Sequence, residues 1–276
     1  MPELPEVETT RRLLEPQIVG RVIRSVEVSR DRMVRKQEQP GDFAARLVER
    51  RIVGTGRHGK HLFIHIVGDV TWVIHLGMSG RVGVGRVGDV RPPHTHVVVV
   101  LDDGNEIRLT DPRTFGHTEA LAPEEVATAS FSAHGPDAYT DPPAPSALAD
   151  RLGHRTAPIK ALLLDQTLLA GIGNIYADES LHRARLAPHR PAGALTRGEI
   201  ERLLEAVATT LEAGLRAGGT TLADMAYLLP DGRSGEFITE LAVYGRDGEP
   251  CPRCGAPIRR DVIRQRSSFW CASCQH

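Results

Sequence analysis

The sequence lacks a long apolar run, a signal segment and an excess of charge of one sign. Its longest β-branched run, Val97–Leu101, is far shorter than the ~18 residues of a membrane-spanning helix, so we expect no membrane partner. The first residues have neither the basic nor the apolar stretch of a secretory signal, which predicts a cytoplasmic location. The 34 basic and 35 acidic residues give a net charge of −1. By itself this balance argues against a nucleic-acid partner, because duplex-binding proteins usually carry a basic excess.

The distribution of the charges reverses that expectation. Residues 250–276 contain five arginines against one acid, a formal charge of +4, and the rest of the chain is acidic. Lysine is also scarce, because all but three of the 34 basic residues are arginine. The exceptions are Lys36, Lys60 and Lys160. Lysine supplies a point charge or an amine that can lose its proton, and arginine cannot supply the latter.

Short β-branched runs separated by glycine turns extend from about residue 20 to residue 120, and they predict a β-sandwich or barrel. Asp102-Asp-Gly-Asn predicts a tight hairpin, and Phe43–Arg51 predicts a short helix. A stretch rich in proline, 132–146, predicts a linker. The chain is therefore expected to be an α+β multidomain protein.

Helical patterns follow the linker. Ile159–Leu169 has apolar residues at helical spacing, and Thr196 with Glu199 forms a capping box before a second amphipathic run. Gly218-Gly219 is expected to end that helix. Residues 220–237 have few apolar anchors and predict a mobile loop.

All four cysteines lie in the basic tail. Their spacing is two residues, then sixteen, then two, over Cys251, Cys254, Cys271 and Cys274. Disulfides are the alternative, but a reducing compartment disfavours them. The spacing predicts one tetrahedral Zn2+, which is structural because four thiolates leave no open ligand position. Ile258–Ile263 and Ser267–Trp270 are expected to form a hairpin that the metal folds, with its arginines facing phosphate.

The N-terminus allows two interpretations. Pro2, Glu3 and Glu6 suit the first turn of a helix, where proline is tolerated and carboxylates complement the positive helix end. Removal of Met1 would alternatively make Pro2 an N-terminal secondary amine. Such an α-amine has a pKa near 7.7–8.0, so a large fraction is unprotonated and able to attack a sugar carbon. The adjacent carboxyls would then move protons.

Seven motifs occur together in one order along nearly the whole chain. They are PELPEVET from Pro2, HGK at 58–60, HLGMSG at 75–80, HTH at 94–96, TDPRTFG at 110–116, GIGNIYADE at 171–179 and QRSSFWC before the last cysteines. In this combination the chain resembles the formamidopyrimidine-DNA glycosylases, bacterial base-excision enzymes for oxidised purines. The resemblance implies an N-terminal β-sandwich, a helix–two-turn–helix domain and a zinc-finger β-hairpin, with duplex DNA containing a damaged base as partner.

The resemblance also implies residue roles. Pro2 would attack C1′ and form a Schiff base, Glu3 would assist sugar opening, and Glu6 would support it. Lys60 would be the acid for β-elimination, and Arg266 would serve δ-elimination. The DNA-contacting positions would be His94, Arg113, Arg155, Lys160 and Asn174. Met78, Arg113 and Phe115 would fill the gap left when the damaged nucleotide is flipped out of the duplex.

Two departures from the family pattern affect substrate range. Thr114 stands where many relatives have a second arginine, and the loop at 219–237 is more apolar than expected for a segment that covers the flipped base. Two rival functions remain. One is an endonuclease VIII-like glycosylase for oxidised pyrimidines, which the PELPEVET start disfavours. The other is a non-enzymatic zinc-ribbon DNA-binding protein, which would not need Pro2, Glu3, Glu6 or Lys60.

The expected domains are a catalytic β-sandwich (1–131), a linker (132–146), a helix–two-turn–helix domain with a lesion-capping loop (147–239) and a zinc-finger hairpin (240–276). We expect a bacterial, nucleoid-associated protein that acts as a monomer.

Overall fold

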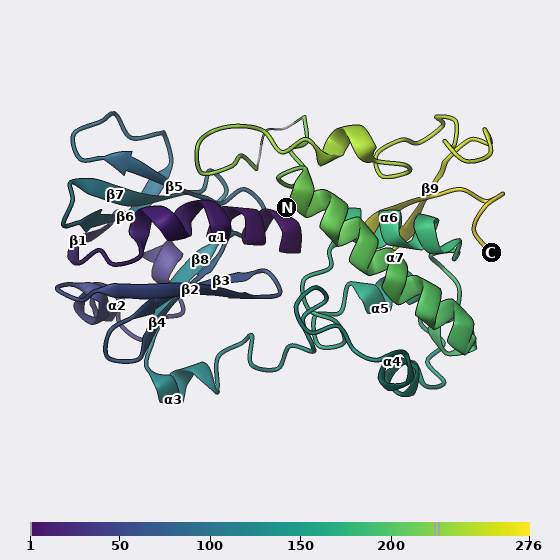
Figure 1. Ribbon diagram of the computed structural model, residues 1–276, viewed down its shortest axis with the longest axis horizontal. Coiled ribbons are helices and arrows are strands. Elements are labelled where there is room, and N and C mark those ends of the chain that lie inside the picture. The colour runs from purple at the N-terminus through teal and green to yellow at the C-terminus, as the bar shows by residue number, and fades with distance from the viewer. Residues whose placement is uncertain (1, 224, 226) are drawn as a thin grey trace. The chain divides into compact units, whose positions relative to one another are not determined.

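The structure is a computed structural model that describes residues 2–223, 225 and 227–276. It divides into two compact units (Figure 1), and each is described by itself. Unit 1 contains residues up to 133 together with 217–238, and unit 2 contains 134–216 and 239–276. Met1, and with it the alternative in which that residue is removed, lies outside the described residues. Within the described part, no helix combines the length and apolarity needed to cross a membrane.

Unit 1 is built on two four-stranded antiparallel sheets, which confirms the expected sandwich. The first sheet has the order β1 (Ile23–Val28), β6 (Thr95–Leu101), β7 (Asn105–Thr110), β5 (Arg81–Arg86). The second has the order β2 (Ile52–His58), β3 (His61–Ile66), β4 (Val70–His75), β8 (His117–Leu121). The hairpin predicted at Asp102-Asp-Gly-Asn joins β6 to β7.

Helix α1 (Leu4–Ile18) packs in the same core as both sheets. Figure 1 shows the helix lying between the two sheets. Its apolar residues Val7, Leu14 and Ile18 join the inward-facing residues of both layers in one buried cluster. This packing positions the first turn of the helix, and with it Pro2, relative to the sheets.

Two of the three remaining short helices of unit 1 add buried residues to this core, Met33 and Val34 from one and Phe43 and Leu47 from the other. The three helices are η1 (Asp31–Val34), α2 (Pro40–Leu47) and α3 (Pro123–Val126). Helix α2 begins and ends earlier than the predicted Phe43–Arg51. Pro40 occupies its first turn, where the missing amide is harmless, and Val48 is extended, followed by Glu49 with φ of 60°.

Unit 2 is largely helical. Its helices are α4 (Pro145–Leu152), α5 (Ile159–Leu163), α6 (Asn174–Ala184), η2 (Ala192–Ala194) and α7 (Arg197–Arg216), and η3 (Phe237–Glu240) lies at the boundary of the units. The capping box is confirmed, because the Thr196 amide donates to the Glu199 carboxylate at 2.8 Å. Helix α7 ends just before Gly218-Gly219, as expected.

Helix α5 is shorter than the helical spacing over Ile159–Leu169 predicts. Asp165 accepts hydrogen bonds from the amide and hydroxyl of Thr167 at 3.0 and 2.7 Å. This local side-chain turn competes with the helical pattern and ends the helix after Leu163.

A two-stranded hairpin completes unit 2. Its strands are β9 (Arg259–Ile263) and β10 (Arg266–Trp270), close to the predicted bounds. Cys251, Ile258, Cys271 and Cys274 form a small buried cluster with Val243. A cluster of this size cannot stabilise the hairpin alone, which agrees with a fold that depends on metal.

Candidate active site and DNA-contacting residues

The N-terminal turn of α1 places the predicted catalytic carboxyls in a buried setting. Glu3 and Glu6 are 2% and 1% exposed, and Pro2 is buried beside them. The Glu3 amide donates to Glu6 Oε2 at 2.7 Å, as in a capping box. The structure thus brings Pro2, Glu3 and Glu6 together.

The other carboxylate oxygen of Glu6 accepts a hydrogen bond from a segment that lies far away in the sequence. The Thr220 amide donates to Glu6 Oε1 at 2.7 Å, and the Tyr227 hydroxyl lies 3.3 Å from the Glu6 carbonyl oxygen. Burial, with the Glu6 charge, raises the pKa of Tyr227, so its hydroxyl stays protonated. A Cβ on Gly219 would come within 2.9 Å of the Glu6 side chain. The described part of the 219–237 loop is therefore attached to the helix that carries Pro2.

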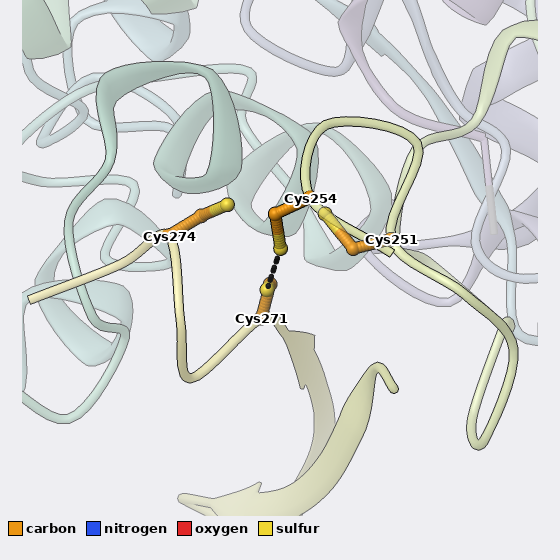
Figure 2. A group of neighbouring side chains, drawn as sticks. All are labelled: Cys251, Cys254, Cys271 and Cys274. Carbon is orange, nitrogen blue, oxygen red and sulfur yellow. Dashed lines mark hydrogen bonds between the residues drawn. The ribbon is translucent and has the colours of Figure 1, made fainter. Parts of the chain in front are cut away.

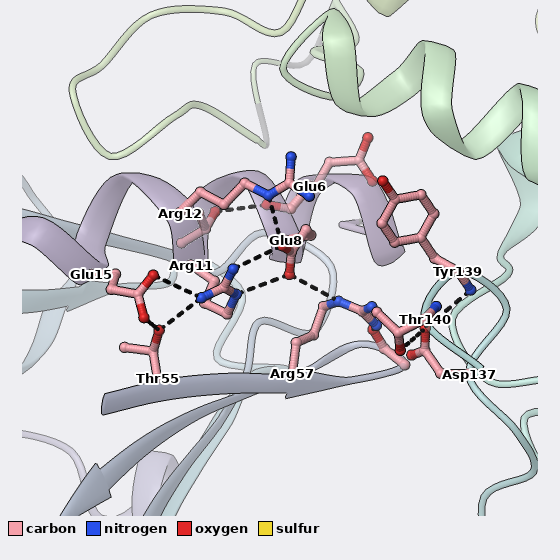
Figure 3. A network of polar contacts seen from close by, with 12 residues as sticks. Glu6, Glu8, Arg11, Arg12, Glu15, Thr55, Arg57, Asp137, Tyr139 and Thr140 are labelled. Atoms are coloured by element: carbon pink, nitrogen blue, oxygen red, sulfur yellow. Dashed lines mark hydrogen bonds and ion pairs between the residues drawn. The ribbon is translucent and has the colours of Figure 1, made fainter. Parts of the chain in front are cut away.

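A polar network on the other side of α1 links this helix to the turn that carries Lys60. Figure 3 shows Glu8 between the guanidinium groups of Arg11 and Arg12 on α1 and that of Arg57 on β2. Burial opposes ionisation of Glu8, but the hydrogen bonds from Arg11 and Arg12 outweigh it and lower its pKa. Arg57 also donates to the Gly59 carbonyl at 3.0 Å. Lys60, only 8% exposed, follows directly in the same turn.

The three expected gap-filling residues lie on two neighbouring loops of unit 1. Met78 follows β4, and Arg113 and Phe115 lie between β7 and β8. Phe115 is 44% exposed, and the Arg113 guanidinium carbon is 4.8 Å from its ring centroid. Met78 is half-buried. An exposed apolar ring beside a cation suits insertion into stacked bases.

Thr114 and His94 both have left-handed backbone conformations. Thr114 has φ of 51° and a buried side chain, and its carbonyl accepts a hydrogen bond from Arg32 at 3.1 Å. His94 has φ of 64° and an exposed side chain, and its carbonyl accepts the Asp111 amide at 3.0 Å. The structure therefore ties His94 to the loop of Arg113.

In unit 2, Asn174 and Lys160 contact the same atom of the hairpin. Asn174 Nδ2 and Lys160 Nζ donate to the Ser267 carbonyl oxygen at 3.0 and 2.7 Å. Lys160 also forms an ion pair with Asp178 at 2.7 Å, and neither side chain is exposed. This burial contradicts the expectation that Lys160 contacts phosphate, because its ammonium group is directed into the unit.

Two neighbouring carboxylates of α6 attach the C-terminal segment. Asp178 accepts the Phe269 amide at 3.0 Å, and Glu179 accepts three consecutive backbone amides, those of Ala242, Val243 and Tyr244, at 2.8 to 2.9 Å. Burial raises the pKa of both groups; the Lys160 ammonium is the main opposing influence on Asp178, and the three backbone amides oppose the shift of Glu179. Neither role was predicted from the sequence, although both residues lie in the GIGNIYADE motif.

Arg155 and Arg266 are exposed, as DNA contacts require. Arg266 opens β10, beside a turn in which Arg264 and Gln265 have φ of 45° and 62°. Burial opposes ionisation of Asp165, but hydrogen bonds from Thr167 and the charges of Arg155 and Arg264 lower its pKa. A cation of the helical part and a cation of the hairpin therefore both influence this carboxylate.

The four cysteines converge in unit 2 as a metal site (Figure 2). Their sulfur atoms all lie within 4.8 Å of one another, and none forms a disulfide. Zn–S bonds of about 2.3 Å in a tetrahedron require sulfur atoms about 3.8 Å apart, so the set fits one structural Zn2+. His182 Nε2 on α6 lies 3.4 Å from Cys251 Sγ and supports this thiolate, a contact that no sequence pattern indicated.

Comparisons with known proteins agree with this geometry. Three family models match the chain: the formamidopyrimidine-DNA glycosylase N-terminal domain over residues 1–118, the H2TH domain over 134–226, and the zinc finger found in FPG and IleRS over 248–276. Formamidopyrimidine-DNA glycosylases from Geobacillus kaustophilus and Mycolicibacterium smegmatis are each 43% identical to the whole chain, over 100% and 97% of their own lengths.

Solved structures give the same result. The crystal structure of the MutM (Fpg) protein from Thermus thermophilus is 41% identical and superimposes with a TM-score of 0.88, covering 99% of this chain and 98% of that one. The Lactococcus lactis Fpg in complex with Fapy-dG-containing DNA is 32% identical, with a TM-score of 0.90 over 99% and 100% of the two chains. The chain belongs to the formamidopyrimidine-DNA glycosylase family.

Proposed function

We propose that this family member uses Pro2 to excise oxidised purines, 8-oxoguanine and formamidopyrimidines, from duplex DNA and then cleaves the strand as an apurinic/apyrimidinic lyase. Membership of the family makes it a DNA glycosylase. Related proteins have been solved in complex with DNA that contains Fapy-dG, carbocyclic 8-oxo-G or an abasic site. The observation that carries the residue assignment is the buried grouping of Pro2, Glu3 and Glu6.

The first step is a displacement at the sugar. With Met1 removed, the Pro2 amine attacks C1′ and the C1′–base bond breaks. The base leaves with the bonding electrons and takes up the proton that the Pro2 nitrogen loses. Glu3 protonates the sugar oxygen as the ring opens, and the nitrogen lone pair completes an iminium ion. Glu6 does not react in this scheme, because both of its oxygens already accept backbone amides.

Strand cleavage follows from the iminium. Water accepts a C2′ proton, the C3′–oxygen bond breaks and the 3′ phosphate leaves, and Lys60 protonates that leaving oxygen. A second elimination expels the 5′ phosphate, whose developing charge Arg266 stabilises. Water then hydrolyses the iminium and regenerates the Pro2 amine. Arg57 supports Lys60 through the Gly59 carbonyl, which fixes the turn relative to α1.

DNA binding requires that the damaged nucleotide leave the duplex. Met78, Arg113 and Phe115 fill the resulting gap, with two apolar side chains and one hydrogen-bonding cation. His94, Arg155 and Asn174 contact the backbone near the lesion. Lys160 contributes indirectly, by fixing the main chain of the hairpin that carries Arg266.

We also propose an oligomeric state, a location and a set of functional domains for this protein. A single chain supplies every group above, so we propose that it acts as a monomer, in the bacterial cytoplasm beside the chromosome. We retain the four expected regions, 1–131, 132–146, 147–239 and 240–276, as functional domains. In the structure, residues 217–238, which the third region includes, group with unit 1.

Borohydride trapping tests the proposal. The chain is incubated with duplexes containing 8-oxoguanine, a formamidopyrimidine, thymine glycol or an abasic site, and the covalent adduct is measured. We expect adducts with the two purine lesions and the abasic site. An uncleaved N-terminal extension turns the Pro2 nitrogen into an amide and should abolish every adduct, whereas the same extension at the C-terminus should not. A preference for thymine glycol would favour the endonuclease VIII-like rival, and absence of any adduct would favour the non-enzymatic one.

A further inference from the structure

Asp111 is a fully buried carboxylate at the end of β7, and it holds both loops that carry the gap-filling residues. Its side chain is 0% exposed. Oδ1 accepts the Ser79 hydroxyl at 2.6 Å and the Arg113 amide at 3.1 Å, and Oδ2 accepts the Gly116 amide at 2.8 Å. Ser79 is the neighbour of Met78, and the two amides flank Phe115. One carboxylate therefore joins the two loops.

The same two loops are in close backbone contact. A Cβ on Gly77, whose φ is 62°, would lie 2.4 Å from the Gly116 nitrogen. A Cβ on Gly116 would lie 2.9 Å from the His75 carbonyl oxygen. The Gly77 amide also donates to His75 Nδ1 at 3.2 Å. The two loops therefore pack backbone against backbone at Gly77 and Gly116.

Two arginines, Arg32 within η1 and Arg35 directly after it, bind the carbonyl groups of the second loop. Arg32 Nε donates to the Thr114 carbonyl at 3.1 Å, and Arg35 donates to the carbonyls of Gly116 and Phe115 at 2.6 and 3.0 Å. Asp111 thus binds amides of the 111–116 segment, and the arginines bind its carbonyls. With its polar backbone groups held in this way, the segment keeps its shape even though Phe115 projects into solvent.

We propose that Asp111 is a positioning residue that holds Met78, Arg113 and Phe115 as one preassembled wedge, with Arg35 completing the support. The inference rests on the wedge role assigned to these three residues under the proposed function. A wedge already in shape does not lose loop entropy when it enters the base stack, so more of its contact energy remains for extruding the nucleotide. Asp111 itself touches neither DNA nor the reacting atoms.

The side chain must accept hydrogen bonds at both of its oxygens to do this, because three donors point at them. An Asn at this position has nearly the same shape, but its NH2 group would face one of those donors. Asp111→Asn is therefore the informative variant, and Ser79→Ala, which removes one of the three hydrogen bonds, is the milder one.

The test compares two substrates in the full-length protein. Excision of 8-oxoguanine from a duplex needs the wedge, whereas borohydride trapping on a single-stranded abasic oligonucleotide does not, because no base stack has to be opened. We expect Asp111→Asn to slow duplex excision about 10- to 100-fold, the range for misplaced positioning groups, with a smaller loss for Ser79→Ala. Single-strand trapping should stay within about twofold of the wild type, the range of a surface substitution.

A fluorescent base reports the insertion step directly. 2-Aminopurine opposite an abasic-site analogue brightens when it is unstacked, and this rise should be lost in Asp111→Asn. The control is Asp102→Asn, an exposed aspartate at the other end of the same hairpin, which should behave as the wild type. If Asp111→Asn fails to fold, Ser79→Ala and Arg35→Gln carry the test with the same three readouts.

The outcomes of these tests distinguish failure of the positioning role of Asp111 from failure of the wedge assignment in the proposed function. Unchanged duplex excision in Asp111→Asn, or an equal loss on both substrates, would overturn the positioning role. If Met78→Ala and Phe115→Ala also leave duplex excision and the 2-aminopurine signal unchanged, the wedge assignment itself is wrong. If those two variants lose both signals while Asp111→Asn keeps them, only the inference about Asp111 fails.

Discussion

The carboxylate of Glu6 joins the first turn of α1 to Thr220, a residue more than two hundred positions later in the chain. One oxygen accepts the Thr220 amide and the other accepts the Glu3 amide, each at 2.7 Å. The side chain is 1% exposed, so water does not replace either partner. A single buried group thus determines both the helix start that presents Pro2 and the attachment of the 219–237 loop.

Glu6→Gln should weaken this connection while keeping the shape of the side chain. The amide NH2 faces a backbone N–H, which leaves a buried donor unpaired at a cost of about 1–3 kcal/mol. We expect the free energy of unfolding in urea to fall by that amount and excision of 8-oxoguanine to slow. Glu38→Gln, at an exposed position, is the control. An unchanged unfolding midpoint would show that the two hydrogen bonds contribute nothing.

Removal of zinc should unfold the hairpin and leave the β-sandwich intact. The two tryptophans separate these events, because Trp72 lies in the sandwich core and Trp270 lies on β10. In a Trp72→Phe background, a chelator or Cys251→Ala should shift the Trp270 emission to the red and abolish binding of duplex DNA. The untreated protein should contain one zinc ion per chain. Full DNA binding after complete loss of zinc would contradict the role of the hairpin.

Lys160→Met should destabilise the protein strongly. It leaves the buried Asp178 charge without its partner, and breaking a buried pair costs about 3–5 kcal/mol. The double variant Lys160→Met/Asp178→Asn should recover part of the loss, as measured by urea unfolding. If Lys160 contacted phosphate instead, the single variant would leave stability nearly unchanged and would weaken DNA binding in low salt.

Exposed arginines should determine the salt dependence of DNA binding, although the whole chain is nearly neutral. Arg266→Gln and Arg155→Gln should each lower the slope of log affinity against log salt by about one, because each loses one phosphate contact. Fluorescence anisotropy over a salt series measures the slope. Arg197→Gln, an exposed residue paired with Glu201 on α7, should leave it unchanged. A flat salt response of the wild type would contradict phosphate contacts altogether.

His117 should make the protein sensitive to mild acid. Burial, reinforced by the neighbouring His75, Lys36 and Arg35, lowers its pKa to about 3. Below the ordinary histidine pKa of about 6.5 the unfolded chain therefore binds a proton that the folded chain does not, so stability falls as the pH falls, by up to about 1.4 kcal/mol per pH unit. Below the folded pKa both states are protonated and this dependence ends.

The corresponding variant is His117→Gln, which cannot titrate. Urea unfolding between about pH 4 and pH 7 should show a shallower pH dependence than in the wild type, by about one proton. The thiolates and carboxylates titrate alike in both proteins and cancel in the comparison. His65→Gln, at an exposed position on β3, is the control. Parallel curves for His117→Gln and the wild type would show that His117 is not the titrating group.

The parts of the fold that depend on local sequence were predictable. The capping box at Thr196, the β6–β7 hairpin and the cysteine ligands follow from short-range spacing, and each was confirmed. Contacts between distant segments were not predictable, because no local pattern records that Glu6 meets Thr220 or that Asp111 meets Ser79. Family resemblance predicted a phosphate contact for Lys160, but the side chain is buried and paired with Asp178. A sequence motif gives the position of a residue in the chain and does not record whether its side chain is buried.

The attachment of the hairpin to α5 and α6 uses main-chain atoms of β10. Lys160 and Asn174 bind the carbonyl oxygen of Ser267, and Asp178 binds the amide of Phe269. Every amino acid except proline offers the same two groups, so exposed side chains of the hairpin can change during evolution without loss of these three contacts. The attachment thus depends on the identity of the three side chains on the helices and not on the identity of the residues at 267 and 269.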